Sequence, residues 1–452
     1  MQIWANTALT ADGWQSGVRV TITDGFVSAI QPNALRDGQT VDILLPAPAN
    51  LHSHAFQRAM AGLTESRGAK STDSFWTWRQ LMYSFLNSLT PDDVEAIAAF
   101  AQMEMLEAGF AHVGEFHYLH HQQDGRAYDN LAEMAERIAA AASQTGIGLT
   151  LLPSLYQQGG CDGAPLDVGQ RRFGCDLDSF ARLFDASIRA IEHLPEDCKT
   201  GVAPHSLRAV TPDGLAAVTA LGKGRPIHLH LAEQKAEMES FTAVFGVGPG
   251  RWLLDHAPVD NRWCLIHCTQ LPAIELAEYA RRGAVAGLCP ITEASLGDGI
   301  FGMPPFLQAE GSFGIGTDSN IRISLAEELR LLEYSQRLRD QQRVIVTAGK
   351  PSAGAGLFAG ALDGGSKALC HGTGRIETGA PADLLALDAT HPDLAGRSGD
   401  LILDSFVFCG DNRMVSHLWA GGRPIVHDGR HFAHDIITAN YHTVMTRLVS
   451  TL

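Results

Sequence analysis

Two histidines separated by one residue, His52 and His54 in LPAPANLHSHAFQ, form the first pattern with evident chemistry. On a β-strand, side chains two positions apart point to the same face, so both imidazoles can reach one metal ion. The pair alone is weak evidence, because two polar side chains on the solvated face of a strand fit the same spacing. Three motifs further along strengthen the metal interpretation: HLHLAE with His228, His230 and Glu233, IHC with His267, and GTDS with Asp318.

A complete metal site can be assembled from these motifs. His52, His54, His230 and Asp318 offer three imidazoles and one carboxylate, which suits zinc with a water molecule at the open position. Such a water loses a proton near neutral pH and becomes a strong nucleophile. Glu233 follows His230 by three residues and is the natural proton carrier. We expect one divalent metal per subunit, Zn²⁺ by preference, although iron or manganese suits the same ligands.

The elements that must position these residues are short apolar runs alternating with helical stretches between residues 50 and 320. The alternation is typical of a parallel sheet with helical crossovers. Eight strand–helix pairs over roughly 270 residues predict one (β/α)8 barrel of the triosephosphate isomerase (TIM) type, with a doubly wound open sheet as the alternative. The expected strands are 50–54, 112–118, 148–156, 200–206, 226–233, 262–268, 284–290 and 312–318.

The candidate ligands lie at or near the C-terminal ends of these strands, where barrel enzymes build their active sites. Each residue also has a simpler interpretation. His267, beside two cysteines, fits a buried core histidine, and Asp318, before Ser319, fits a helix cap. His228 lies deeper in the barrel than His230, and we interpret it as structural.

The two ends of the chain differ from the barrel region. Residues 1 to about 47 and residues 377–431 contain short alternating strands separated by turn residues. We expect residues 1–47 and 377–452 to form one composite β-sandwich domain and residues 48–376 to form the barrel. Two independent caps are the alternative.

Composition limits the function classes. The chain has 452 residues, of which 45% are hydrophobic, and a net charge of -16, which argues against nucleic acid or an anionic membrane as partner. The N-terminus does not read as a secretory signal, and no run of about 18 apolar residues could span a bilayer. We therefore expect a cytoplasmic protein. The eight cysteines form no CxxC motif and are expected to be free thiols.

A second group of polar residues should face the open end of the barrel: Gln57, Arg79, Tyr118, His205 and Arg208. Arginines, a tyrosine and a glutamine near a metal site predict a small anionic substrate with one or two carboxylates. A surface salt bridge remains the simpler interpretation of each arginine taken alone.

Two features stay open. The loop Ala61–Ser74, before Trp76 and Trp78, is long enough for a lid that excludes water from the metal, but the tryptophans could equally pack a helix onto the barrel. Glu293, in the loop after the seventh strand, is a weaker site candidate than a structural loop residue.

The motifs LHSH, HLHLAE, IHC and GTDS, together with GAPADLLALD and LWAGGRPIVHDGRH near the C-terminus, make the chain resemble the amidohydrolase superfamily over essentially its whole length. Members with two metals use a carboxylated lysine from the fourth strand. Here that strand ends in His205, with Lys199 only at its beginning, so the resemblance implies the single-metal branch, which mostly hydrolyses amidine-like C=N bonds and releases ammonia. Ala47 replaces the glycine of the superfamily's LPG sequence, which puts only the local turn in doubt.

The resemblance also implies roles for individual residues. It assigns the metal to the four ligands named above, and His267 hydrogen-bonds and polarises the attacking water. Asp318 accepts the water proton as attack begins. Glu233 delivers a proton to the imino nitrogen, so that the amine can leave.

A closer resemblance rests on six strings: NLHSHAFQRAMAG, DSFWTWRQLMY, EFHYLHH, HSLRAV, HLHLAEQ and TEASLGDGIF. They are similar to the formimidoylglutamate deiminase family of histidine degradation. The resemblance implies hydrolysis of N-formimino-L-glutamate to N-formyl-L-glutamate and ammonia by a homodimer. It also implies that Arg208, Arg79, Tyr118 and Gln57 bind the glutamate carboxylates, while His205 lies against the formimino group or a carboxylate.

Two other functions are compatible with parts of the sequence. One is a single-metal aminohydrolase that acts on a heterocycle such as guanine. The other is a non-catalytic assembly protein that keeps the barrel without the chemistry. The second is disfavoured, because such a protein has no reason to keep both His267 and Glu233 beside four metal ligands.

Overall fold

A closed barrel of parallel strands forms the centre of the molecule in the computed structural model, which describes residues 1–65 and 75–450. Strands β5 to β8 form one parallel sheet and β10 to β13 another. Bridges from Ser53 to Asp318 and from Val202 to Ile227 join the two sheets. The predicted TIM-type barrel is therefore confirmed. Its strands are β5 (Ala49–Ser53), β6 (His112–His117), β7 (Gly148–Leu155), β8 (Lys199–Thr200), β9 (Ala203–Pro204), β10 (Ile227–Leu231), β11 (Trp263–His267), β12 (Val285–Leu288) and β13 (Ser312–Ile315).

The fourth strand position differs from the prediction. Instead of one strand over 200–206, two short pieces, β8 and β9, each pair with β7. Pro204 ends the second piece, and proline has no N–H with which to extend a ladder. The chain continues to His205, whose N–H still donates to Leu155 O at 3.1 Å. The position of the strand end in the barrel is thus preserved.

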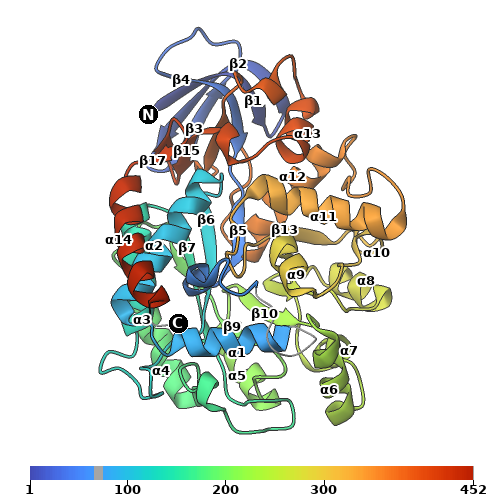
Figure 1. Ribbon diagram of the computed structural model, residues 1–452. Helices are drawn as coiled ribbons and strands as arrows, with labels where there is room; N and C mark the ends of the chain where they lie inside the picture. Colours follow the sequence, from blue (N-terminus) through green and yellow to red (C-terminus); the bar gives the residue numbers. More distant parts are fainter. Residues whose placement is uncertain (66–74, 451–452) are drawn as a thin grey trace.

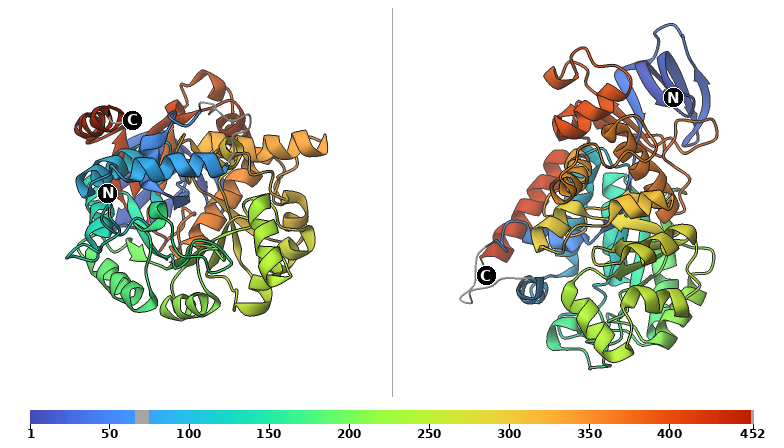
Figure 2. Two further views of the ribbon diagram at one scale, coloured as in Figure 1. Left: turned by 60° about the horizontal axis from the view of Figure 1, so that its bottom comes forward. Right: turned by 90° about the vertical axis from the view of Figure 1, so that its right-hand side faces the viewer.

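Helices cover the outside of the barrel (Figures 1 and 2). Thr90 caps the start of α2: its hydroxyl accepts from Asp93 N at 3.3 Å, and the Asp93 carboxylate accepts from Thr90 N at 2.8 Å. The helices between β5 and the last strands are α1 (Phe75–Leu86), α2 (Pro91–Glu107), α3 (Glu133–Thr145), α4 (Leu177–Ala190), α5 (Pro212–Leu221), α6 (Lys235–Phe245), α7 (Pro249–His256), α8 (Ala273–Arg281), α9 (Pro290–Leu296), α10 (Met303–Gln308), α11 (Leu325–Asp340) and α12 (Ala353–Ala368).

The glycine-rich helix α12 packs directly on the barrel. A Cβ atom added at Gly360 or Gly364 would collide with Phe313 on β13. The glycines therefore serve close helix–strand packing.

Both ends of the chain build one mixed sheet at one end of the barrel (Figure 1). Its strand order is β17-β16-β15-β14-β4-β1-β2-β3, and β4 joins the two ends of the chain by pairing antiparallel with β14. The alternative of two independent caps is thus wrong. The strands are β1 (Gln2–Thr10), β2 (Gly13–Thr23), β3 (Phe26–Gln31), β4 (Gln39–Pro46), β14 (Leu384–Leu387), β15 (Val415–Ala420), β16 (Arg423–His427) and β17 (Arg430–His431).

The helices of the C-terminal segment pack on helices of the barrel, and α13 (Asp400–Phe408) also contacts this sheet where Asp400 accepts from Trp14 Nε1 at 2.9 Å. Helix α13 contacts α11 and α12, and α14 (His434–Val449) contacts α2 along the side of the barrel (Figure 2). The division of the chain at residues 47 and 377 therefore stays a prediction.

The mixed sheet and the expected active site lie at opposite ends of the barrel. Strand β4 leads directly into β5, so the barrel strands begin next to the sheet and end away from it. Helix α1 and the short helix η1 (Ala55–Met60) lie near that far end (Figure 1). Of the helices that the structure describes, none is long and apolar enough to cross a membrane.

Candidate active site

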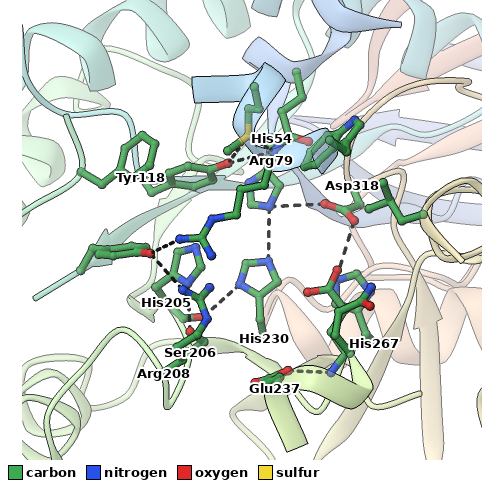
Figure 3. A pocket seen from close by; sticks show the side chains of 18 of the residues that line it. His54, Arg79, Tyr118, His205, Ser206, Arg208, His230, Glu237, His267 and Asp318 are labelled. Atoms are coloured by element: carbon green, nitrogen blue, oxygen red, sulfur yellow. Dashed lines mark hydrogen bonds and ion pairs between the residues drawn. The ribbon is translucent and has the colours of Figure 1, made fainter. Parts of the chain in front are cut away.

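One pocket at the C-terminal ends of the barrel strands gathers the residues singled out by sequence (Figure 3). It encloses about 750 Å³, part of which is open to solvent. His52 lies beneath it with no exposed surface. All the other predicted metal, catalytic and substrate residues line the pocket: His54, Gln57, Arg79, Tyr118, His205, Arg208, His230, Glu233, His267 and Asp318.

The four expected ligands converge on one point. His54 Nε2 lies 3.3 Å from His230 Nε2 and 3.3 Å from Asp318 Oδ1. His52 Nε2 lies 3.4 Å from the same Asp318 oxygen. Strand β5 supplies His52 and leads into His54, β10 supplies His230, and Asp318 follows β13, so three strand positions of the closed barrel build the group.

Hydrogen bonds from the backbone fix the orientation of two of these rings. His54 Nδ1 lies 2.9 Å from Phe116 O, and His230 Nδ1 lies 2.9 Å from His205 O. A carbonyl only accepts, so each Nδ1 carries the proton and each Nε2 carries a lone pair. Lone pairs 3.3 Å apart repel unless a cation lies between them. His52 Nε2 is buried and makes no hydrogen bond within the described residues. This donor set fits a divalent metal.

Burial keeps these imidazoles neutral, as metal ligation requires. It lowers the pKa of His52 to about 3 and also lowers the pKa of His54. Burial and the neighbouring histidines hold the pKa of His230 well below its usual value. For Asp318, burial opposes ionisation, but the neighbouring histidines, with His52 first among them, outweigh it and lower the pKa of the carboxyl.

The backbone around the pocket is strained at several strand ends. His267 has φ 71°, Asp318 has φ 45°, and Ala232, between His230 and Glu233, has φ 52°. Residues other than glycine rarely adopt this left-handed region, and such strain persists where the surrounding structure enforces it, often at functional sites.

His267 lies between two carboxylates on the pocket side. Its Nε2 atom is 3.8 Å from Glu233 Oε1 and 3.8 Å from Asp318 Oδ2. Burial lowers the pKa of His267, but Glu233, Glu293 and Asp318 together raise it well above its usual value. Burial raises the pKa of Glu233 to about 7, so this carboxyl exchanges its proton near neutral pH, which suits a proton carrier.

Glu293, left open by the sequence, contacts the far side of the His267 ring. Its Oε1 atom lies 3.3 Å from His267 Nδ1 and accepts from Cys289 N at 2.9 Å. A carboxylate at Nδ1 fixes the ring orientation, so Glu293 supports the site. It lies in the first turn of α9 and not in a loop, so the expected loop position is wrong.

The opposite side of the pocket carries two arginines (Figure 3). Arg208 Nη1 donates to Tyr156 OH at 3.2 Å, and Arg79 Nη2 donates to the same oxygen at 3.4 Å. Within the described part of the chain, no carboxylate oxygen lies within 4.0 Å of the Arg208 guanidinium. A half-buried cation without a paired anion has lost part of its hydration, so this side of the pocket favours an anionic ligand.

The remaining predicted residues connect the two sides of the pocket. Gln57 Nε2 donates to Tyr118 OH at 2.8 Å. His205 orients His230 through its carbonyl, and burial, with Arg208 nearby, holds the pKa of the His205 ring well below its usual value. His228 lies outside the pocket lining, and its Nε2 makes a 2.9 Å hydrogen bond with Ala368 O, which supports the structural interpretation.

Sequence reasoning missed several lining residues, of which Tyr156 and Glu237 matter most. Tyr156 ends the run GLTLLPSLY, as Tyr118 ends HVGEFHY, and this shared strand-end position was the available signal. Glu237 follows Glu233 by four residues and accepts from Glu233 N at 2.9 Å. That spacing, one helical turn, was the corresponding signal for Glu237.

The expected lid is only partly described. Residues 66–74 and the side chain of Trp76 lie outside the described residues, while Trp78 on α1 lines the pocket. Trp78 therefore contributes to the pocket wall, whereas closure of the loop over the metal site stays a prediction.

Comparisons with known proteins identify the family of this chain. Residues 43–425 match the model of the amidohydrolase family, and residues 1–40 match the model described as formimidoylglutamate deiminase HutF, N-terminal domain. The formimidoylglutamate deiminase of Pseudomonas aeruginosa is 46% identical over 95% of both chains. A 5-methylthioadenosine/S-adenosylhomocysteine deaminase of Natronomonas pharaonis is 27% identical over 89% of this chain and 86% of the relative.

Solved structures extend the comparison to the fold. An amidohydrolase from Brucella melitensis is 46% identical and matches 99% of both chains with a TM-score of 0.95. An adenosine deaminase from Xanthomonas campestris with bound zinc shares the fold, with a TM-score of 0.81 at 20% identity over 99% of this chain and 98% of that one. With the family model spanning most of its length, this chain belongs to the amidohydrolase family.

Proposed function

We propose that the protein is a metal-dependent formimidoylglutamate deiminase, which hydrolyses N-formimino-L-glutamate to N-formyl-L-glutamate and ammonia. The observation that carries the proposal is the polarity of the pocket, with metal ligands and carboxylates on one side and Arg79 and Arg208 on the other. The substrate has a matching arrangement, because its amidine lies at one end of the molecule, its side-chain carboxylate lies at the other end, and its α-carboxylate lies on the carbon that carries the amidine nitrogen. The 46% identity to the Pseudomonas aeruginosa enzyme supports the same substrate.

The metal would be held by His52, His54, His230 and Asp318. When bound, it supplies a Lewis acid that makes a water molecule nucleophilic near neutral pH. We propose zinc, since three imidazole nitrogens and one carboxylate oxygen suit it. Metal analysis of purified protein tests both the occupancy and the identity, since iron or manganese would indicate a different resident metal.

Individual residues then carry out separate steps of the reaction. Hydrolysis adds water to the C=N carbon, moves both water protons to nitrogen or solvent, and breaks the C–N bond to ammonia. Asp318, 3.8 Å from His267 Nε2, accepts a proton from the attacking water, and His267 orients that water by a hydrogen bond. Glu233, whose pKa is raised to about 7 by burial, delivers a proton to the imino nitrogen. The proton held by Asp318 passes to the same nitrogen as the C–N bond breaks, ammonia leaves, and the remaining hydroxyl proton returns to Glu233.

Substrate placement depends on the opposite side of the pocket. Arg208 and Arg79 bind the glutamate carboxylates through charge-assisted hydrogen bonds, and Tyr118 and Gln57 contribute neutral donors. His205 lies between this group and the metal ligands, where it can contact the formimino group or a carboxylate. Fixing the carboxylates fixes the amidine carbon relative to the catalytic groups.

The proposal is tested by ammonia release from metal-loaded protein. N-formimino-L-glutamate should be hydrolysed to N-formyl-L-glutamate with one equivalent of ammonia, while guanine and adenosine should release none above background. Ammonia release from a heterocycle alone would instead support the aminohydrolase alternative. If the protein releases no ammonia from any of these substrates and also binds no metal after loading, the non-catalytic barrel would be supported.

Three further expectations remain proposals. We infer a homodimer, a cytoplasmic location and a functional division between the barrel at residues 48–376 and the segments at both ends. Light scattering coupled to size-exclusion chromatography tests the dimer directly. A monomer across a range of protein concentrations would remove that part of the proposal.

A further inference from the structure

We propose that Tyr156 is a further specificity-determining residue, whose hydroxyl donates its hydrogen to a carboxylate of the substrate. This inference rests on the proposed function. Tyr156 follows β7 directly, is 2% exposed, and lines the pocket on the side of Arg79 and Arg208.

Three N–H donors point at the Tyr156 oxygen. Gln170 Nε2 lies 3.0 Å away, Arg208 Nη1 lies 3.2 Å away, and Arg79 Nη2 lies 3.4 Å away. Guanidinium groups only donate, so neither arginine can accept the tyrosine hydrogen.

The Gln170 amide is also oriented as a donor towards Tyr156. Gln170 Oε1 accepts from Asp167 N at 2.9 Å, and Gln170 Nε2 lies 3.4 Å from Gly159 O. A flipped amide would place two donors together at Asp167 and two acceptors together at Gly159, so the observed orientation is the one that satisfies both neighbours.

The Tyr156 O–H hydrogen therefore has no acceptor among the described residues. A phenol oxygen that accepts from its neighbours must direct its own hydrogen elsewhere, and an unmade hydrogen bond in a buried site costs free energy. The hydroxyl lines the pocket, so the ligand itself is the available acceptor.

The charges beside Tyr156 select the chemical class of that acceptor. Two guanidinium groups approach the hydroxyl, and Arg208 has no carboxylate oxygen within 4.0 Å in the described chain. A neutral carbonyl would satisfy the hydroxyl but leave the Arg208 charge without an anion, whereas a carboxylate satisfies both groups and can also accept from Arg79. The geometry thus favours a dicarboxylate substrate with one carboxylate held by Arg79, Tyr156 and Arg208.

Replacing Tyr156 with phenylalanine removes this one hydrogen and keeps the ring. In Tyr156→Phe we expect the KM for N-formimino-L-glutamate to rise about 10- to 100-fold, the range for a lost hydrogen bond to a charged group, with kcat changed less than about threefold. A fall in kcat at unchanged KM would overturn the proposal.

Two analogues identify the carboxylate concerned. N-formimino-4-aminobutyrate lacks the α-carboxylate, and N-formimino-2-aminobutyrate lacks the side-chain carboxylate. The ratio of kcat/KM between wild type and Tyr156→Phe should approach one on the analogue that lacks the contacted group, and stay high on the other. The same ratio on all three substrates would mean a structural effect and overturn the proposal.

Tyr279→Phe is the matched control. Tyr279 is also buried, but its hydroxyl donates to Gly250 O at 2.6 Å outside the pocket lining, so no KM change is expected. If Tyr156→Phe does not fold, Gln170→Glu gives a second test on the same three substrates. The new carboxylate accepts the Tyr156 hydrogen within the protein, so among the three substrates the KM for N-formimino-L-glutamate should rise most. A KM change of the same size on all three substrates would overturn the proposal.

Binding of glutarate separates this proposal from the proposed function. Calorimetry with metal-loaded wild type and Tyr156→Phe measures the hydroxyl–carboxylate contact without turnover. A wild type inactive on N-formimino-L-glutamate would refute the function, while weaker glutarate binding by the variant would still support the contact. Equal binding by both proteins would overturn the contact.

Discussion

The two sides of the pocket are built in different ways. The metal side, with His52, His54 and His230, comes from barrel strands and the residue after one, and backbone carbonyls fix two of the three rings. The side with Arg79 and Arg208, called here the carboxylate side because it would bind the substrate carboxylates, comes from α1, the end of β7 and the loop before α5. Both arginines contact a tyrosine hydroxyl. The difference indicates that the rigid barrel fixes the chemistry, while the surrounding loops and helices fix the choice of substrate.

The largest effect should follow a change on the metal side. In Asp318→Asn the side chain keeps an oxygen that can contact the metal but loses the group that accepts the water proton. We expect kcat for ammonia release to fall by at least about 10³-fold, within the range for loss of general base catalysis. The metal content of the variant serves as the control, because loss of the metal would by itself lower kcat even if Asp318 were not the general base. Full activity would contradict the role of Asp318.

Glu233→Gln should give the next largest effect. The amide fills the same volume but cannot deliver the proton, so kcat should fall about 10²-fold or more while KM changes little. Steady-state kinetics separate the two constants. A rise in KM with unchanged kcat would instead place Glu233 on the binding side of the pocket.

A change on the carboxylate side should act on binding. In Arg208→Met we expect the KM for N-formimino-L-glutamate to rise about 10- to 100-fold, because a charge-assisted hydrogen bond is lost, while kcat stays within a few-fold. Arg126→Met, an exposed arginine paired with Asp124, is the matched control and should change neither constant. A variant of Arg208 with wild-type KM would break the distinction between the two sides.

Metal removal should give the smallest measured change, a shift in thermal stability. Chelation leaves the lone pairs of His54 and His230 facing each other, so the midpoint of unfolding should fall by several degrees, and added zinc should restore it. Calorimetry of chelated and reloaded protein measures the shift. Asp318→Ala should reduce the response to zinc, and an undiminished response in that variant would place the stabilising metal elsewhere.

The metal side is predictable from the sequence because its signals are local. An HxH pattern on a strand has few structural solutions, and the strand ends of a barrel meet at one end, so spacing alone predicts that His52, His230 and Asp318 lie together. The eight strand positions follow from the same alternation. The split between Thr200 and Ala203 was not foreseen, because strand breaks depend on pairing with β7.

The carboxylate side was less predictable because its residues act through long-range contacts. Arg79 and Arg208 were singled out by position, but the role of Tyr156 depends on three donors from different parts of the chain. Likewise, Glu293 gains its role only from the rotamer that places it 3.3 Å from His267 Nδ1. Spacing in the sequence does not encode such contacts.

We propose that one pocket recognises both the amidine and the carboxylates of the same molecule. The most direct test compares kcat/KM for ammonia release from N-formimino-L-glutamate with that from N-propylformamidine, which keeps the amidine and lacks both carboxylates. We predict a ratio of at least about 10³ for metal-loaded wild type, since two charge-assisted interactions are lost. Equal values for the two substrates would contradict the claim.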